Sequence, residues 1–306
     1  MKIGIAFGGG GAKGLAHVGV LRALRRRKIY APAIAAGTSV GSIAAALYAG
    51  GISQTTIEAL TKSVDWFPNV ISFQDTVKHY IETKFEGLVS NANLGNMINR
   101  YMDGKTFNEL EIDLAIISTD IENYRRVIFT SKRVSRSIDF EELYSFLPPP
   151  ADCKPGFSTV VVDDFDNIGE AVRASCAVPG VFMPVEINGM QLFDGGLVDQ
   201  VPVDVARAMG ADLTIGISLS LSSLPRKSTR IMRAVSRSIE FLGVHQIRKS
   251  LELADIGFQI PDIDKRSFIN LKQYDLIGKG EETMEYWLNR LEEKISEKLR
   301  QEDHHY

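Results

Sequence analysis

Short apolar runs alternate with amphipathic stretches along the N-terminal part of the chain. Residues 2–7 (KIGIAF) are mostly apolar and end at four glycines, which predicts a short buried strand. Leucine and valine then recur every three or four positions over residues 12–28, which predicts a helix. Residues 34–36 predict a second strand, and the alanine-rich residues 40–49 a second helix that ends at a glycine pair. This repeated strand–turn–helix unit indicates a parallel sheet buried on both faces.

The same patterns continue through the rest of the chain. Further strands are expected at 114–118, 127–130, 159–162 and 213–218, and a type I′ hairpin at 181–193 around Asn188-Gly189. Helices are expected over most of 52–108 and at 203–209, 226–254 and 281–300. Residues 131–156 contain three consecutive prolines and little periodicity, which predicts a long loop or cap.

These elements predict one α/β core and a C-terminal extension. We expect the core at residues 1–220, with cap or loop insertions near 62–105 and 131–157. Residues 221–306 are expected to form a helical extension that packs on the core.

Composition is that of an ordinary globular protein, with 44% hydrophobic and 24% charged residues. The 35 Lys and Arg and 38 Asp and Glu give a net charge of −3, which provides no whole-chain attraction to nucleic acid. Two cysteines, Cys153 and Cys176, argue against a disulfide framework.

The N-terminal apolar run is about five residues, too short for a signal peptide, and no stretch approaches the ~20 apolar residues of a membrane span. We therefore expect a cytoplasmic protein, with contact at a membrane surface left open.

A glycine-rich loop, residues 9–14 (GGGAKG), follows the first strand and opens a helix. It satisfies G-x-G-x-x-G, but a dinucleotide site needs an acidic residue about 20 positions later. Residues 29–36 contain none. The P-loop pattern G-x-x-x-x-G-K-[ST] does not match, because the lysine here precedes the last glycine and no Ser or Thr follows. Glycines at a helix start let backbone N–H groups converge on one anionic atom, so we favour an oxyanion-binding loop over an ordinary tight turn.

A second motif, residues 37–41 (GTSVG), matches G-x-S-x-G and places Ser39 between a predicted strand and a predicted helix. This is the context of a nucleophile elbow, although a serine here is also a common helix N-cap. A nucleophilic serine needs a base, and no histidine ends a predicted strand. The five histidines are His17, His79, His245, His304 and His305.

Asp194 does end a predicted strand, directly before Gly195 and Gly196. A carboxylate in this place can reach a neighbouring loop, although Asp-Gly is also a common turn dipeptide. A free aspartate has a pKa of about 3.9 and is a weak base for a hydroxyl. Partial burial would raise that pKa. If Asp194 acts as the base, we expect the catalytic rate to fall at acidic pH, where the carboxylate becomes protonated.

Taken together, these motifs resemble the patatin-like phospholipase family. The family's G-G-G-x-[KR]-G, G-x-S-x-G and D-G-[GA] motifs are matched in this order at 9–14, 37–41 and 194–196. Residues 174–185 (ASCAVPGVFMPV) are also similar to the family's A-S-x-x-x-P-x-x-F-x-P stretch. The resemblance covers roughly residues 3–220.

The resemblance implies a three-layer α/β/α sandwich with a mainly parallel central sheet, and a Ser–Asp dyad that requires no histidine. Ser39 would attack an ester carbonyl and Asp194 would act as base. The backbone N–H groups of Gly9, Gly10 and Gly11 would form the oxyanion hole. Lys13, Gly37, Gly41, Gly195 and Gly196 would support the site. The implied substrate is a phospholipid or lysophospholipid cleaved through an acyl-enzyme, and neither a metal nor a cofactor is expected.

One position departs from the family pattern, and two other functions stay open. Gln200 stands where the D-G-G-x-x-x-N-x-P pattern has asparagine, so the amide is kept on a longer side chain. The alternatives to the hydrolase are a non-catalytic regulatory or adaptor protein on the same fold and a nucleotide-binding module that uses the glycine loop.

Four further features have competing interpretations. Aromatic clusters at 62–80 and 139–157 could cap an apolar channel, but we prefer ordinary core. Lys13 could meet a phosphate headgroup, or it could be a solvated lysine at a helix start. The basic residues 226–249 could dock on an anionic membrane, but we prefer a solvated face over a core helix. Residues 163–167 lack EF-hand spacing and are interpreted as a polar loop.

Overall fold

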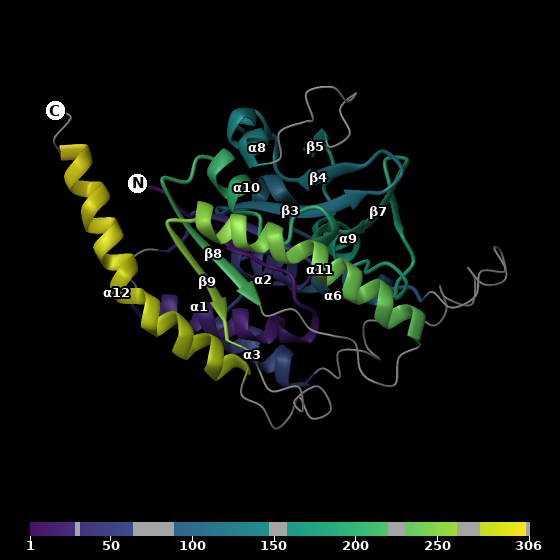
Figure 1. The fold of residues 1–306 in the computed structure, drawn as a ribbon, viewed down its shortest axis with the longest axis horizontal. Coiled ribbons are helices and arrows are strands. Elements are labelled where there is room, and N and C mark those ends of the chain that lie inside the picture. Colours follow the sequence, from purple (N-terminus) through teal and green to yellow (C-terminus); the bar gives the residue numbers. More distant parts are fainter. Residues whose placement is uncertain (28–30, 64–88, 147–157, 220–229, 262–275, 304–306) are drawn as a thin grey trace.

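The computed structural model describes residues 1–27, 31–63, 89–146, 158–219, 230–261 and 276–303. Within these residues, one sheet has the strand order β5-β4-β3-β2-β1-β8-β9, and a β6–β7 hairpin joins it through β7 and β3 (Figure 1). The strands are β1 (Ile3–Phe7), β2 (Ile34–Thr38), β3 (Asp113–Asp120), β4 (Arg125–Phe129), β5 (Ser158–Val162), β6 (Val185–Ile187), β7 (Met190–Asp194), β8 (Leu213–Leu219) and β9 (Ile256–Ile260). Neighbouring strands are parallel except at the β3–β4, β3–β7 and β6–β7 pairs.

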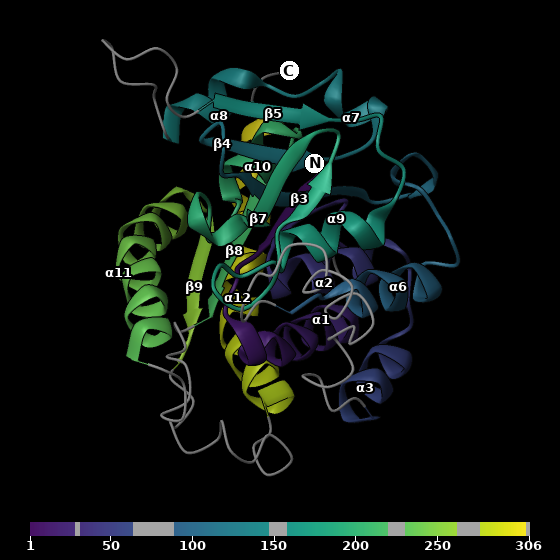
Figure 2. The ribbon, with the colours of Figure 1, turned by 90° about the vertical axis from the view of Figure 1, so that its right-hand side faces the viewer.

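Helices cover both faces of this sheet, so the fold has three layers (Figure 2). One layer contains α1 (Leu15–Arg27), α2 (Val40–Ala49), α3 (Gln54–Ser63), α6 (Ala92–Tyr101), α9 (Ile168–Ser175) and α12 (Leu276–Asp303). The opposite layer contains α8 (Phe140–Phe146), α10 (Val203–Ala208) and α11 (Arg230–Leu253). Short helices are α7 (Lys132–Ser135), η1 (Gly11–Gly14), η2 (Phe107–Glu109) and η3 (Gly195–Leu197). The α/β architecture with a mainly parallel central sheet is therefore confirmed.

The adjacent central strands β1 and β2 are almost entirely apolar because each face of the sheet is buried. In β2, Ile34 and Ala36 belong to the apolar cluster shared with α10, whereas Ala35 belongs to the cluster shared with α1 and α2. All three are fully buried. Successive side chains of a strand point to opposite faces, so a strand between two helix layers needs no polar positions.

Two segments differ from the sequence-based expectation. Part of the stretch expected as a loop or cap is helical, since α7 and α8 lie within it, and Leu143 of α8 is buried in the α10 cluster. The expected helical extension also contains β9, which pairs in parallel with β8 and extends the sheet. The hairpin expectation is confirmed, because Asn188 and Gly189 both have positive φ, as a type I′ turn requires.

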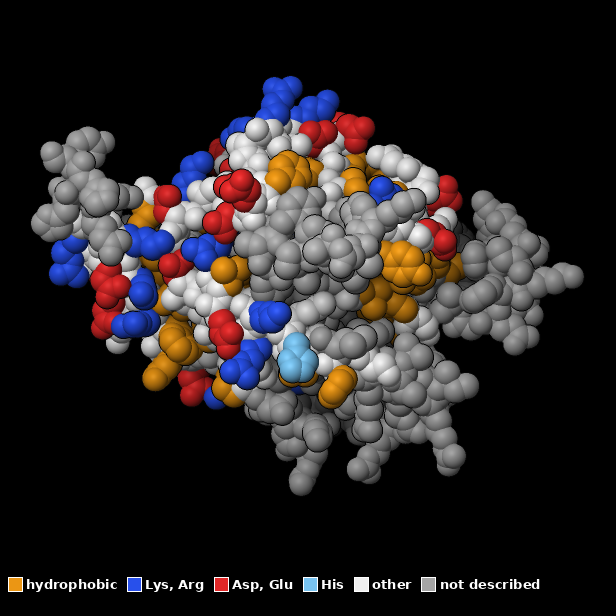
Figure 3. All heavy atoms as spheres, turned by 45° about the horizontal axis from the view of Figure 1, so that its top comes forward, with side chains coloured by type: hydrophobic (Ala, Val, Ile, Leu, Met, Phe, Trp, Pro, Cys, Tyr) orange, Lys and Arg blue, Asp and Glu red, His pale blue; other side chains and the backbone are white. Residues whose placement is uncertain are grey.

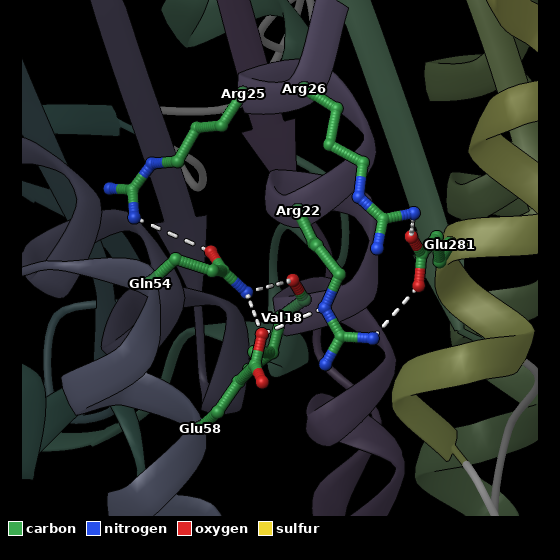
Figure 4. A network of polar contacts seen from close by, with 7 residues as sticks. All are labelled: Val18, Arg22, Arg25, Arg26, Gln54, Glu58 and Glu281. Atoms are coloured by element: carbon green, nitrogen blue, oxygen red, sulfur yellow. Dashed lines mark hydrogen bonds and ion pairs between the residues drawn. The ribbon is translucent and has the colours of Figure 1, made fainter.

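The C-terminal helix α12 packs along α1 and is held there by a polar network (Figure 4). Arg22 of α1 donates to Glu58 of α3 at 2.7 Å and to Glu281 of α12 at 2.8 Å. Arg26 adds an ion pair to Glu281. Beneath these charges, the 3–4 spacing seen in the sequence buries an apolar stripe of α12, formed by Met284, Leu288, Leu291 and Ile295.

Candidate active site

Strands β2 and β7 bring two distant segments together on the same edge of β3. Strand β2 runs parallel to β3 and ends with Thr38 opposite Ile117. Strand β7 runs antiparallel to β3 and ends with Asp194 opposite Ser118. The carboxyl ends of β2 and β7 therefore meet head to head at the Ile117–Ser118 junction, and this topology places the residue after Thr38, the elbow serine, beside Asp194.

Ser39 has the strained backbone of a nucleophile elbow. Its φ is 54° and its ψ is −129°, outside the common regions for a residue with a side chain. Its N–H donates to the Ser175 hydroxyl at 2.9 Å, and that hydroxyl donates to the Ile117 carbonyl. The strain is accommodated by glycines on both sides, because a Cβ at Gly37 would lie 2.4 Å from the Gly41 carbonyl oxygen.

We expect Ser175→Ala to destabilise the protein by about 1–3 kcal/mol, because it leaves two buried backbone groups without this partner. Urea unfolding of the variant and the wild type measures the difference. Ser118→Ala is the matched control, since the Ser118 hydroxyl is buried and has no hydrogen-bond partner among the described residues. Equal losses from both variants would contradict the bridging role of Ser175.

Asp194 forms the central contact of the site. The Ser39 Oγ donates to the Asp194 Oδ2 at 2.7 Å, across 155 positions of sequence. The Gly196 N–H donates to the other carboxylate oxygen at 2.8 Å. Both residues are 7% exposed. Burial raises the pKa of Asp194 to about 6, against the two hydrogen bonds, which lower it. The carboxylate is thereby a stronger base than a free aspartate and is still ionised at neutral pH.

Gln200 joins the loop that follows Asp194 to the glycine loop. Its side-chain amide donates to the Gly196 carbonyl at 3.1 Å. Its backbone carbonyl accepts the Gly9 N–H at 3.0 Å. The longer side chain at this position therefore holds the backbone just beyond the Asp194 carboxylate.

A buried ion cluster fixes the far end of the same loop. Arg126 of β4 donates to Asp199 at 2.9 Å and to Asp204 of α10 at 2.7 Å, with all three side chains at most 3% exposed. Burial, together with the nearby Asp204 carboxylate, raises the pKa of Asp199. The sequence analysis missed this cluster, because its members lie far apart in the chain and match no motif.

The glycine loop lies beside Ser39 and is held at its first peptide. A Cβ on Gly9 would come within 3.3 Å of the Ser39 Cβ. The Gly8 carbonyl accepts a hydrogen bond from His17 Nε2 at 2.8 Å, while the Gly9 N–H is taken by Gln200. The Gly9 amide is thus engaged within the protein, and in this conformation it is not an oxyanion donor, contrary to the expectation for this residue.

His17 of α1 has a structural role, because it holds the start of the glycine loop. It is fully buried against Phe7, with ring centroids 5.1 Å apart. Burial lowers its pKa to about 4, so the ring is neutral at pH 7 and donates one hydrogen bond to Gly8. His245 is exposed on α11. His79, His304 and His305 lie outside the described residues.

Several other expectations can be compared with the structure. Lys13 is only 5% exposed, so it is not a solvated lysine. Residues 64–80, with most of one aromatic cluster, lie outside the described part of the chain. The polar loop 163–167 ends in Asn167, which caps α9. The described residues contain no cluster of side chains suited to a metal ion. None of the described helices is long and apolar enough to span a membrane.

Comparison with known proteins gives relatives over most of this chain. It is 26% identical over 221 residues to an uncharacterized NTE family protein of Mycobacterium bovis, covering 72% of this chain and 49% of that protein. It is 32% identical over 215 residues to a patatin-like phospholipase domain-containing protein of Caenorhabditis elegans, covering 70% of this chain and 13% of that protein. It is 29% identical over 225 residues to lysophospholipase NTE1 of Saccharomyces cerevisiae, covering 71% of this chain and 11% of that protein. The chain thus spans half or less of these relatives.

Among solved structures, VipD of Legionella pneumophila is matched with a TM-score of 0.48 and 14% identity, over 94% of this chain and 66% of that one. The family model for patatin-like phospholipase matches residues 5–207, which include the glycine loop, Ser39 and Asp194. The chain therefore belongs to the patatin-like phospholipase family.

Proposed function

We propose that the protein is a serine acyl hydrolase that cleaves lipid esters with a Ser39–Asp194 dyad. The observation that carries the proposal is the 2.7 Å hydrogen bond from the Ser39 hydroxyl to a buried carboxylate, at a serine with positive φ. A hydroxyl hydrogen-bonded to a base of raised pKa is the arrangement that activates a serine nucleophile.

The reaction proceeds in two halves. Ser39 Oγ attacks the ester carbonyl as its proton passes to Asp194, and collapse of the tetrahedral intermediate releases the alcohol with that proton. Water then attacks the acyl-enzyme, with Asp194 again taking the proton, and the fatty acid leaves as Ser39 is restored. Each proton and electron pair has its source in the dyad or in water, so the proposed sequence requires no cofactor.

We propose that the oxyanion is held by backbone amides of Gly10 and Gly11. These residues follow the peptide fixed by His17 and Gln200, and they lie at the start of η1, which leads directly into α1. The loop lies against Ser39, as the packing of Gly9 shows. Fixing the peptide in advance means that the loop need not reorganise as the charge develops.

The proposed substrate is a phospholipid or a lysophospholipid. Membership of the family supports a lipid ester, and the yeast relative is named a lysophospholipase.

Reaction with a fluorophosphonate tests the proposal. An activated serine displaces fluoride from phosphorus, so we expect a mass increase located at Ser39 by peptide mass spectrometry. The labelling rate should rise about tenfold per pH unit below pH 6 and level off above it, because Asp194 must be ionised to accept the proton.

Two controls define the result. Ser39→Ala and wild-type protein unfolded in urea should both stay unlabelled. No adduct on the folded protein at neutral pH would contradict the hydrolase and favour the non-catalytic adaptor. A rate independent of pH between 4 and 8 would contradict the role of Asp194 as the base.

A further inference from the structure

The outward face of helix α11 carries exposed apolar and basic side chains. Phe241 is 72% exposed and Val244 is 50% exposed. His245 and Arg248 are also exposed. The spacing of these four residues follows the helical repeat, so they share one stripe along the helix. Figure 3 shows a histidine bordered by basic and hydrophobic side chains on this side of the molecule.

The inward face of α11 packs on the catalytic loop. A Cβ at Gly243 would contact the Gln200 side chain at 3.2 Å, and Ile247 packs in the apolar cluster with Val201 and Val203. Gln200 in turn holds the backbone next to Asp194. A helix is about 10 Å across, so the outward face is roughly one helix diameter from this loop.

The charge of this region differs from that of the whole protein. Residues 226–249 contain seven Lys and Arg and one Glu, whereas the chain has a net charge of −3. Of these basic residues, Arg248 and Lys249 are exposed on the same helix as Phe241 and Val244. Local positive charge beside exposed aromatic and aliphatic side chains is the combination that binds anionic lipid surfaces.

We propose that this face, formed by Phe241, Val244, His245, Arg248 and Lys249, docks the protein on an anionic lipid bilayer. We prefer docking to a solvated basic face because Phe241 and Val244, 72% and 50% exposed, lie one helical turn apart beside the basic residues. The proposal rests on the proposed function, in that docking brings the lipid substrate to the Asp194 loop. Phe241 and Val244 enter the acyl boundary, while the basic residues meet the headgroup phosphates.

Vesicle partition of the Ser39→Ala protein tests the docking without consuming the lipid. We expect binding to phosphatidylcholine vesicles that contain about 30% phosphatidylglycerol, weaker binding to phosphatidylcholine alone, and loss of binding at high salt. Phe241→Ser should lower the partition about tenfold. The double variant Arg248→Gln, Lys249→Gln should lower it about thirtyfold on the anionic vesicles only.

Helix α12 offers matched controls. Tyr286 is 78% exposed, and Arg290 has an exposed Glu partner at 3.0 Å, as Arg248 has at 2.8 Å. Tyr286→Ser and Arg290→Gln should leave the partition unchanged. Equal losses from Phe241→Ser and Tyr286→Ser, or equal binding to both vesicle types, would overturn the proposal. A wild-type dimer in sedimentation velocity that Phe241→Ser dissociates would assign the face to a second copy instead.

Hydrolysis of a water-soluble short-chain ester separates docking from catalysis. Phe241→Ser, made in the otherwise wild-type protein, should cleave this ester at the wild-type rate and cleave vesicle lipid about tenfold more slowly. If the wild-type protein cleaves no ester, the proposed function fails while the vesicle partition still decides the docking. If the variant loses both activities equally, the docking proposal fails.

Discussion

Asp194→Asn is expected to lower ester hydrolysis by roughly 10²–10⁴-fold, because the amide cannot accept the proton of Ser39. The change keeps the shape of the side chain and its contacts. The amide oxygen can still accept the Gly196 N–H, and the amide nitrogen can donate to Ser39 Oγ. The loss should therefore appear in kcat, with little change in KM.

The same substitution is expected to stabilise the protein at neutral pH. The Asp194 pKa rises from 3.8 in the unfolded chain to about 6 in the native state, so the native state binds the extra proton between these values. Wild-type stability then falls as the pH rises from below 3 to above 7, by about 3 kcal/mol in total at 1.36 kcal/mol per pH unit. The amide does not titrate and avoids this cost.

Urea unfolding at pH 4 and at pH 8 measures the effect. We expect the stability difference between Asp194→Asn and the wild type to be about 2 kcal/mol more in favour of the variant at pH 8 than at pH 4. Ser39→Ala is the control, because it also abolishes hydrolysis but retains the titrating carboxylate. A difference that does not change with pH would show that Asp194 has an ordinary pKa.

Gly41→Ala is expected to cost more than about 4 kcal/mol of stability, or to prevent folding. A Cβ at this position would lie 2.1 Å from the Phe7 carbonyl oxygen and 2.6 Å from its carbon. The clash would be between the new Cβ in the first turn of α2 and a backbone carbonyl at the end of β1. A backbone carbonyl in a strand cannot rotate away as a side chain can. Relief of the clash would separate the glycine loop from the nucleophile elbow.

Gly51→Ala, just beyond the other end of α2, is the matched control. Gly51 has a φ of 75° and no atom within 4 Å of its added Cβ, so only backbone strain of about 1–2 kcal/mol is expected. Urea unfolding and circular dichroism compare the two variants. If Gly41→Ala costs no more than Gly51→Ala, the close approach of the two loops is not a requirement of the fold.

The pattern of apolar residues and glycines determined the local elements. The strands at the start of the chain, the Asn188-Gly189 hairpin and the apolar stripe of α12 all follow from short-range periodicity and turn chemistry. Strand β9 and helix α8 were missed. In both cases the short segment is stabilised by packing on a distant element, β8 for the strand and α10 for the helix.

For the candidate site, motif resemblance assigned the serine and the aspartate, and the elbow context came from the residues themselves. The signal for Ser175 was present in the A-S-x-x-x-P stretch, but its hydrogen bond to Ser39 could not be read from it. The hydrogen bond from the Gly9 amide to Gln200 could not be predicted either, because its acceptor is a backbone carbonyl, which every residue has.

The sequence by itself thus determined which residues could carry the chemistry and where the chain turns, since both depend on side chains a few positions apart. Only the tertiary structure decided that Ser39 and Asp194 meet, because that depends on β2 and β7 approaching β3 from opposite directions. It also decided the strength of the base, because the Asp194 pKa is set by the removal of water from around the carboxylate. Burial of this kind is a property of the packed fold, to which residues from many elements contribute.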